Sequence, residues 1–139
     1  MIIDRFGYDS YAQENIECYS RIIDSASRDF TTIIVCSSGF MTYREDIHSD
    51  YVKIKKQIFE HPLTFVLLPS LCLERCVQEI LKRQMGRSYL KIQLEKEQYK
   101  ITKRFYIYSQ LPCKMILTNV EPLCVLNNIK NEIYQYIKF

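Results

Sequence analysis

Two uncharged runs of strand length set the strongest limit on how this chain folds. Phe30–Cys36 reads FTTIIVC and Leu63–Leu68 reads LTFVLL, and neither run contains a charged side chain. Such runs of β-branched and apolar residues are typical of strands buried on both faces of a parallel sheet. We therefore predict that both runs are buried strands.

Segments with helical periodicity alternate with these runs. Apolar residues recur at helical spacing in five segments, which are 10–27, 48–59, 70–84, 95–108 and 122–137. A further short strand is predicted at 113–118. Alternation of this kind predicts an α/β fold of three layers, a parallel sheet with helices on both faces.

In such a sheet, ligands bind beyond the carboxyl ends of the strands. The segments at those ends are Ser37–Tyr43, Pro69–Ser70 and Thr118–Pro122. A binding site is therefore expected there.

Composition narrows the class of partner. The 139 residues fit one domain, and 47% apolar with 25% charged residues is the balance of a globular protein. The net charge of +3 is too small to indicate nucleic-acid binding. Basic residues cluster in Lys82–Arg87 and Lys96–Arg104, which favours a local anionic ligand, a small-molecule substrate or a nucleotide.

The six cysteines indicate neither a metal site nor disulfides. No CxxC occurs; Cys72 and Cys76 lie four residues apart on a predicted helix, where two small apolar side chains on one face account for them. The N-terminus turns polar by Asp4, and the longest apolar runs are about six residues, short of the ~20 that a membrane span needs. We therefore expect a cytoplasmic protein with reduced thiols and no membrane partner.

The stretch Arg104–Asn119, RFYIYSQLPCKMILTN, resembles the C-terminal part of the shikimate kinase family. In that family of P-loop phosphotransferases, an Arg precedes by four residues a Tyr that closes a helix, and Thr-Asn follows the Tyr after a short strand. Tyr108 and Thr118 have the family's spacing. Upstream, Arg87-Ser88-Tyr89-Leu90 resembles the family's lid, and Val35–Phe40 falls at its glycine-rich substrate turn. The resemblance covers residue 5 to the end and implies one kinase-like domain, 1–139, with a lid-like loop at about 83–95.

The resemblance also implies an ATP site with Mg²⁺. Arg87 would be the catalytic lid arginine over the ATP phosphates, as positive charge around a transferring phosphoryl group requires. Arg83 would pack on the adenine, and Asn119 and Pro122 would form the opposite wall. The alternative for these arginines, and for Arg104, is a solvated basic helix face.

On the substrate side the resemblance is weaker. Arg104 matches the arginine that holds the substrate carboxylate, and Ser38 and Gly39 fall in the substrate turn. The family's three glycines have become Ser37-Ser38-Gly39, and Tyr11-Ala12 stands in place of its Phe-Arg pair. These departures argue against shikimate as the acceptor.

The P-loop itself is missing. No G-x-x-x-x-G-K-[ST] occurs, and the three glycines, Gly7, Gly39 and Gly86, are isolated. In the family the P-loop follows a strand that lies in the middle of the sheet, so the fold is expected to be incomplete at its N-terminus. Without that strand, its neighbours lose a ladder partner.

Three hypotheses follow. The first is a kinase-like phosphotransferase fragment or variant, inactive as this chain alone. The second is a non-catalytic binding or oligomerising domain descended from such a kinase, and a third is a regulatory nucleotide- or phosphate-binding module that uses Arg83 and Arg87. A sheet with unpaired edges also predicts a homodimer.

Overall fold

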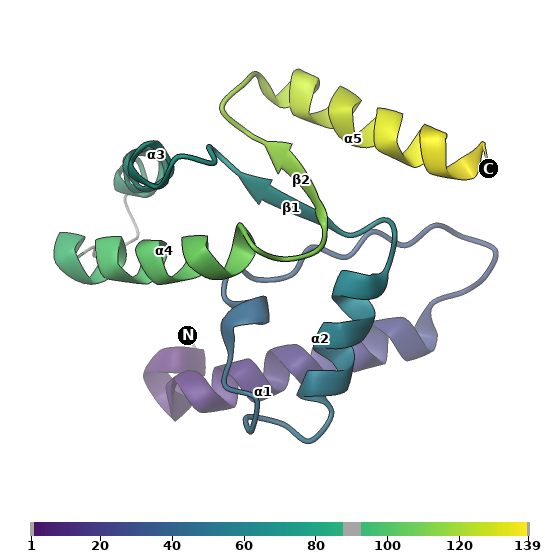
Figure 1. Cartoon of the computed structure of the whole chain (residues 1–139). Helices are drawn as coiled ribbons and strands as arrows, with labels where there is room; N and C mark the ends of the chain where they lie inside the picture. Colours follow the sequence, from purple (N-terminus) through teal and green to yellow (C-terminus); the bar gives the residue numbers. More distant parts are fainter. Residues whose placement is uncertain (1, 88–92, 139) are drawn as a thin grey trace. The chain divides into compact units, whose positions relative to one another are not determined.

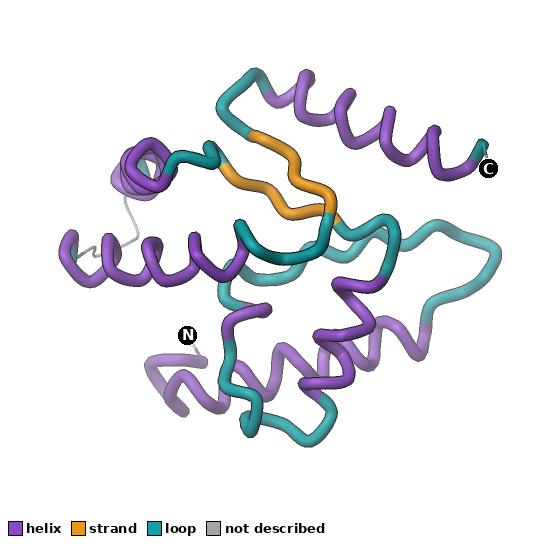
Figure 2. Tube along the Cα trace, viewed as in Figure 1, coloured by secondary structure: helices purple, strands orange, loops and turns teal. Residues whose placement is uncertain are grey.

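The computed structural model describes residues 2–87 and 93–138, and most of them are helical (Figures 1 and 2). In chain order the elements are α1 (Ile2–Ser25), a 3₁₀ turn η1 (Phe40–Thr42), α2 (Tyr51–Glu60), β1 (Phe65–Leu68), α3 (Leu73–Met85), α4 (Leu94–Tyr108), β2 (Lys114–Leu117) and α5 (Pro122–Ile137). The chain divides into two compact units, Met1–Lys56 and Gln57–Phe139. The single domain expected over 1–139 stays a prediction. No helix in the described ranges combines the length and apolar character needed to cross a bilayer.

The N-terminal unit has a core of helix and turn residues. α1 bends at Gly7, whose φ of 84° is a conformation that glycine adopts without steric cost. Beyond the bend, α1 contributes two buried side chains to this core. The other buried side chains come from η1, the loop after it and α2. The buried residues are Ala12, Ile16, Phe40, Met41, Tyr43, Ile47, Tyr51 and Ile54.

The strand predicted at 30–36 is wrong, and with it the three-layer α/β fold built on a parallel sheet. The segment between α1 and η1 is a loop (Figure 2), and Phe30, Ile33 and Val35 are 78%, 83% and 88% exposed. The sheet of the described residues has two strands only. The physical reason is that β-branched residues favour a strand only where a neighbouring strand pairs with it and a face buries its side chains. Phe30–Cys36 has neither here.

The C-terminal unit contains that sheet. β1 and β2 are parallel, in a register from Phe65 opposite Lys114 to Leu68 opposite Leu117. The strands predicted at 63–68 and 113–118 are therefore confirmed in a shorter form. The five predicted helical segments are also helices, with ends shifted by a few residues at most positions and by eight residues at the start of α1, which begins at Ile2.

Helices cover each face of this small sheet. On one face, Val66 and Leu68 form a core with Cys76 of α3 and Phe105 of α4. On the other face lie Lys114 and Ile116, because side chains alternate along a strand. Lys114 pairs with Glu132 of α5, and Ile116 is buried. α3 and α4 thus pack on one side, and α5 lies along β2 on the other (Figure 1).

Candidate functional site

The carboxyl ends of β1 and β2 lie together, because the strands are parallel and in register. The Leu68 carbonyl accepts a hydrogen bond from the Thr118 N–H at 2.8 Å, which extends the ladder past β2. After β1, the Ser70 hydroxyl accepts a bond from the Cys72 N–H at 3.1 Å, and α3 begins at Leu73. This edge is where the sequence predicts a site.

Arg83 joins α3 to this edge. Its Nη2 donates to the Thr118 carbonyl at 2.9 Å, and its Nη1 donates to the Thr118 hydroxyl at 3.2 Å. Its Nε donates to Glu79 one turn earlier on α3, at 3.0 Å. The guanidinium therefore lies beside the loop after β2. All three of its nitrogens donate within the protein, however, so it acts as a structural link.

Among the contacts found between described residues, none joins the other predicted ATP-site residues, Arg87, Asn119 and Pro122, to one another. Arg87 is exposed just beyond α3, where its N–H bonds the Gln84 carbonyl at 2.9 Å. Asn119 and Pro122 are exposed, on the loop after β2 and at the start of α5. Of the lid-like loop predicted at about 83–95, the first residues are helical and 88–92 lie outside the described residues.

The predicted substrate residues belong to different units. Arg104 is half-buried on α4 in the C-terminal unit. Ser38 and Gly39 precede η1 in the N-terminal unit. The Gly39 carbonyl accepts bonds from the Thr42 N–H at 2.9 Å and the Thr42 hydroxyl at 2.8 Å, so Gly39 closes a turn.

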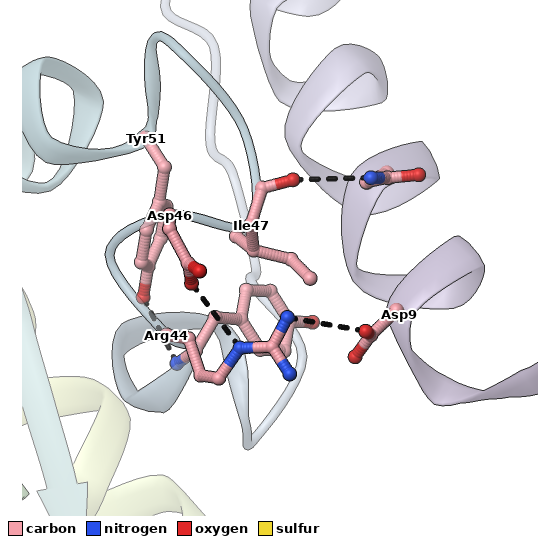
Figure 3. A network of polar contacts seen from close by, with 7 residues as sticks. Asp9, Arg44, Asp46, Ile47 and Tyr51 are labelled. Atoms are coloured by element: carbon pink, nitrogen blue, oxygen red, sulfur yellow. Dashed lines mark hydrogen bonds and ion pairs between the residues drawn. The ribbon is translucent and has the colours of Figure 1, made fainter.

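Sequence reasoning missed a polar network in the N-terminal unit (Figure 3). The Tyr51 hydroxyl donates to the Phe40 carbonyl at 2.6 Å. It also accepts a hydrogen bond from the Tyr43 N–H at 3.1 Å. The Gln13 amide of α1 donates to the Ile47 carbonyl at 3.1 Å. These bonds satisfy backbone groups of an irregular segment that has no ladder of its own.

At the rim of this network, Arg44 pairs with two carboxylates. It reaches Asp9 of α1 and Asp46, each at 3.2 Å (Figure 3). All three side chains are well exposed, so the pairs contribute little to stability. The only sequence signal for the network is the abundance of aromatic residues, which does not say which rings meet.

The shifted acid–base groups do not form a reactive centre. Burial raises the pKa of Tyr43, while a hydrogen bond between its hydroxyl and that of Ser37 opposes that shift. Burial also raises the pKa of the Cys36, Cys76 and Cys113 thiols. Nucleophilic cysteines need a lowered pKa. These thiols therefore stay protonated near neutral pH and act as small apolar side chains.

A shallow groove lies between α3 and α4. Its volume is about 590 Å³. It is lined by apolar and uncharged polar side chains with one carboxylate, namely Cys72, Leu73, Glu74, Val77, Gln78, Leu81, Gln98 and Thr102. Within residues 2–87 and 93–138, no three His, Cys, Asp or Glu side chains gather to hold a metal ion, so no residue is assigned to Mg²⁺.

No protein-family model, curated protein or solved structure matches this chain.

Proposed function

We propose that this chain is a non-catalytic domain whose role is to associate with a second copy of itself. One observation carries the proposal. The uncharged segment Phe30–Cys36 exposes the apolar side chains of Phe30, Ile33 and Val35, and its backbone forms no hydrogen bond to another backbone group of the described residues. Monomeric proteins rarely expose contiguous apolar surface of this kind, and where they do it often marks a binding site.

The energetics favour covering the segment. Burying a Val, Ile or Phe side chain contributes about 1.5–3 kcal/mol relative to leaving it in water. Ile33, Val35 and Phe30 lie within six residues of one another. A partner that covers these three side chains gains this burial free energy. If the partner also pairs with the backbone of the segment, the N–H and C=O groups of the segment are hydrogen-bonded when water is excluded.

The side chains that could act in catalysis, the thiols and Arg83, are either not activated or already bonded within the protein. The buried thiols have raised pKa values, and Arg83 is bonded to Thr118 and Glu79. These facts support a binding domain over an enzyme. We also propose a cytoplasmic location, because the six thiols are free and a reducing compartment keeps them so.

Sedimentation equilibrium tests the proposal. At micromolar concentration the chain is expected to be a dimer that dissociates on dilution. A monomer across the whole range would contradict it.

A second candidate is the nucleotide-binding role, because Arg83 lies beside Thr118 at the strand ends. With no P-loop lysine, ATP should bind weakly and without sharp magnesium dependence. Calorimetry checks this, with Arg83→Ala as the variant and Arg75→Ala, at an exposed arginine earlier on α3, as its matched control. A micromolar, magnesium-dependent dissociation constant would instead favour the kinase-like hypothesis.

A further inference from the structure

We infer that the two copies associate by reciprocal strand addition. Phe30–Cys36 of each copy pairs, as an added strand, with the open edge of β1 in the other copy. This inference rests on the proposed self-association and specifies the segments that carry it. It explains two unpaired features of the chain with one contact.

The first feature is the segment itself. Five of its seven residues, Thr31–Val35, are β-branched and follow one another directly. These residue types favour extended, paired backbone. Ile33 and Val35 are exposed whereas Ile34 and Cys36 are half-buried, which is the alternation of a strand with one side to solvent.

The second feature is the outer edge of β1. Leu68 directs its carbonyl to Thr118 in the β2 ladder. Backbone groups of successive strand residues point to opposite edges, so Leu67 directs its N–H and C=O away from β2. The described sheet has only the pair β1–β2, so this edge carries no strand. The Leu67 side chain is 51% exposed as well.

Apart from its shortness, since β1 has four residues, the edge lacks the usual protection against strand addition. Exposed edges are normally blunted by charged side chains, prolines within the strand or bulges. No charged residue occurs between His61 and Glu74, and the only prolines there flank the strand at Pro62 and Pro69. An uncharged strand can therefore pair without bringing like charges together or burying an unpaired charge.

The same chain thus supplies both halves of the contact. A partner strand must be uncharged, apolar and extended, and Phe30–Cys36 meets these requirements. Main-chain pairing provides affinity and alternate side chains provide specificity, as in other strand-addition complexes. In the reciprocal arrangement that we propose, two copies exchange strands with each other, so the contact is two-fold and leaves neither a segment nor an edge unpaired.

A proline at the edge tests the β1 half. Leu67→Pro removes the outward N–H without removing a β1–β2 hydrogen bond, since prolines are tolerated on edges whose N–H faces outward. Leu67→Ala is the matched control, because it shortens the same side chain and keeps the N–H. Sedimentation equilibrium should give a dissociation constant raised about tenfold or more for Leu67→Pro relative to Leu67→Ala. Circular dichroism verifies that both variants stay folded.

A charge in the segment tests the other half independently of β1. Ile33→Lys places a charge on an exposed position of the segment and should raise the dissociation constant by a similar factor, about tenfold. Val52→Lys, at an exposed apolar position on α2 of the same unit, is its control and should leave the constant unchanged. Because Ile33 is exposed, its substitution should not affect folding.

Mixing the two variants gives the sharpest test. A copy with Leu67→Pro still offers an intact segment, and a copy with Ile33→Lys still offers an intact edge. Each variant alone should be monomeric at concentrations where the mixture forms a heterodimer through one intact strand pair. A wild-type dimer that neither variant weakens would overturn strand addition and leave self-association standing. A monomeric wild type would overturn both.

Discussion

The two units satisfy the hydrogen-bonding groups of their non-helical backbone in different ways. In the C-terminal unit, the Leu68 carbonyl is bonded within the ladder by the Thr118 N–H. In the N-terminal unit, the Phe40 carbonyl and the Tyr43 N–H are bonded by one side chain, the Tyr51 hydroxyl. A ladder repeats along a strand, whereas a side chain serves only the groups within its reach. Neither side chain bonds Phe30–Cys36, and the backbone of this segment forms no hydrogen bond to another backbone group of the described residues.

The largest expected effect comes from removing the centre of the N-terminal core. Tyr51 is fully buried, so Tyr51→Ala leaves a cavity and should cost about 3–5 kcal/mol of unfolding free energy, as for other large aromatic truncations. Chemical denaturation measures the loss. Tyr134→Ala, at an exposed position on α5, is the matched control and should change stability by about 0.5 kcal/mol or less. Equal losses would contradict the role given to Tyr51.

Removing only the Tyr51 hydroxyl measures how much its hydrogen bonds contribute to stability, apart from the packing of the ring. Tyr51→Phe keeps the ring but leaves a buried carbonyl and a buried N–H unpaired, which should cost about 1–3 kcal/mol. The comparison is Thr118→Val, because the Thr118 ladder bond to Leu68 survives loss of the hydroxyl. The same denaturation experiment should give a clearly smaller loss for Thr118→Val. Reversal of this order would break the contrast between the two units.

Above pH 8, the stability of the wild type and that of Tyr43→Phe should depend on pH to different extents. Burial raises the pKa of Tyr43, so its neutral form is favoured in the folded state. That contribution is complete below the ordinary tyrosine pKa of about 10 and is lost as the pH rises through the folded pKa. Unfolding monitored from pH 8 upward should show this decline in the wild type and a weaker decline in Tyr43→Phe. Identical profiles would exclude Tyr43 as a source.

The smallest expected effect is at the arginine link of the C-terminal unit. Arg83 is half-exposed, so Arg83→Ala should cost under about 1 kcal/mol. Arg87→Ala should cost less, because Arg87 is exposed beyond the end of α3. A loss of several kcal/mol for Arg83→Ala would mean that the link to Thr118 supports more of the unit than the ladder does.

The sequence predicted the elements of the C-terminal unit well, because their signals are local. Pro62 and the apolar run after it mark β1, and periodic apolar positions mark α3, α4 and α5. The same signals failed at Phe30–Cys36, since a strand needs a partner that local sequence does not reveal. The adenine site that the resemblance implied, with Arg83 and the loop after β2 as opposite walls, stays a prediction. No local signal predicted that Thr118 and Glu79 would engage the guanidinium.

Amide hydrogen exchange at residues 30–36 tests the central claim most directly, with the wild-type protein and concentration as the only variable. At concentrations below the dissociation constant, these amides should exchange as fast as unpaired backbone does, because no strand among the described residues of the same chain pairs with them. Above it, alternate amides of the segment and the Leu67 amide should become protected together. Fast exchange at every concentration, in a protein that sediments as a dimer, would contradict the account.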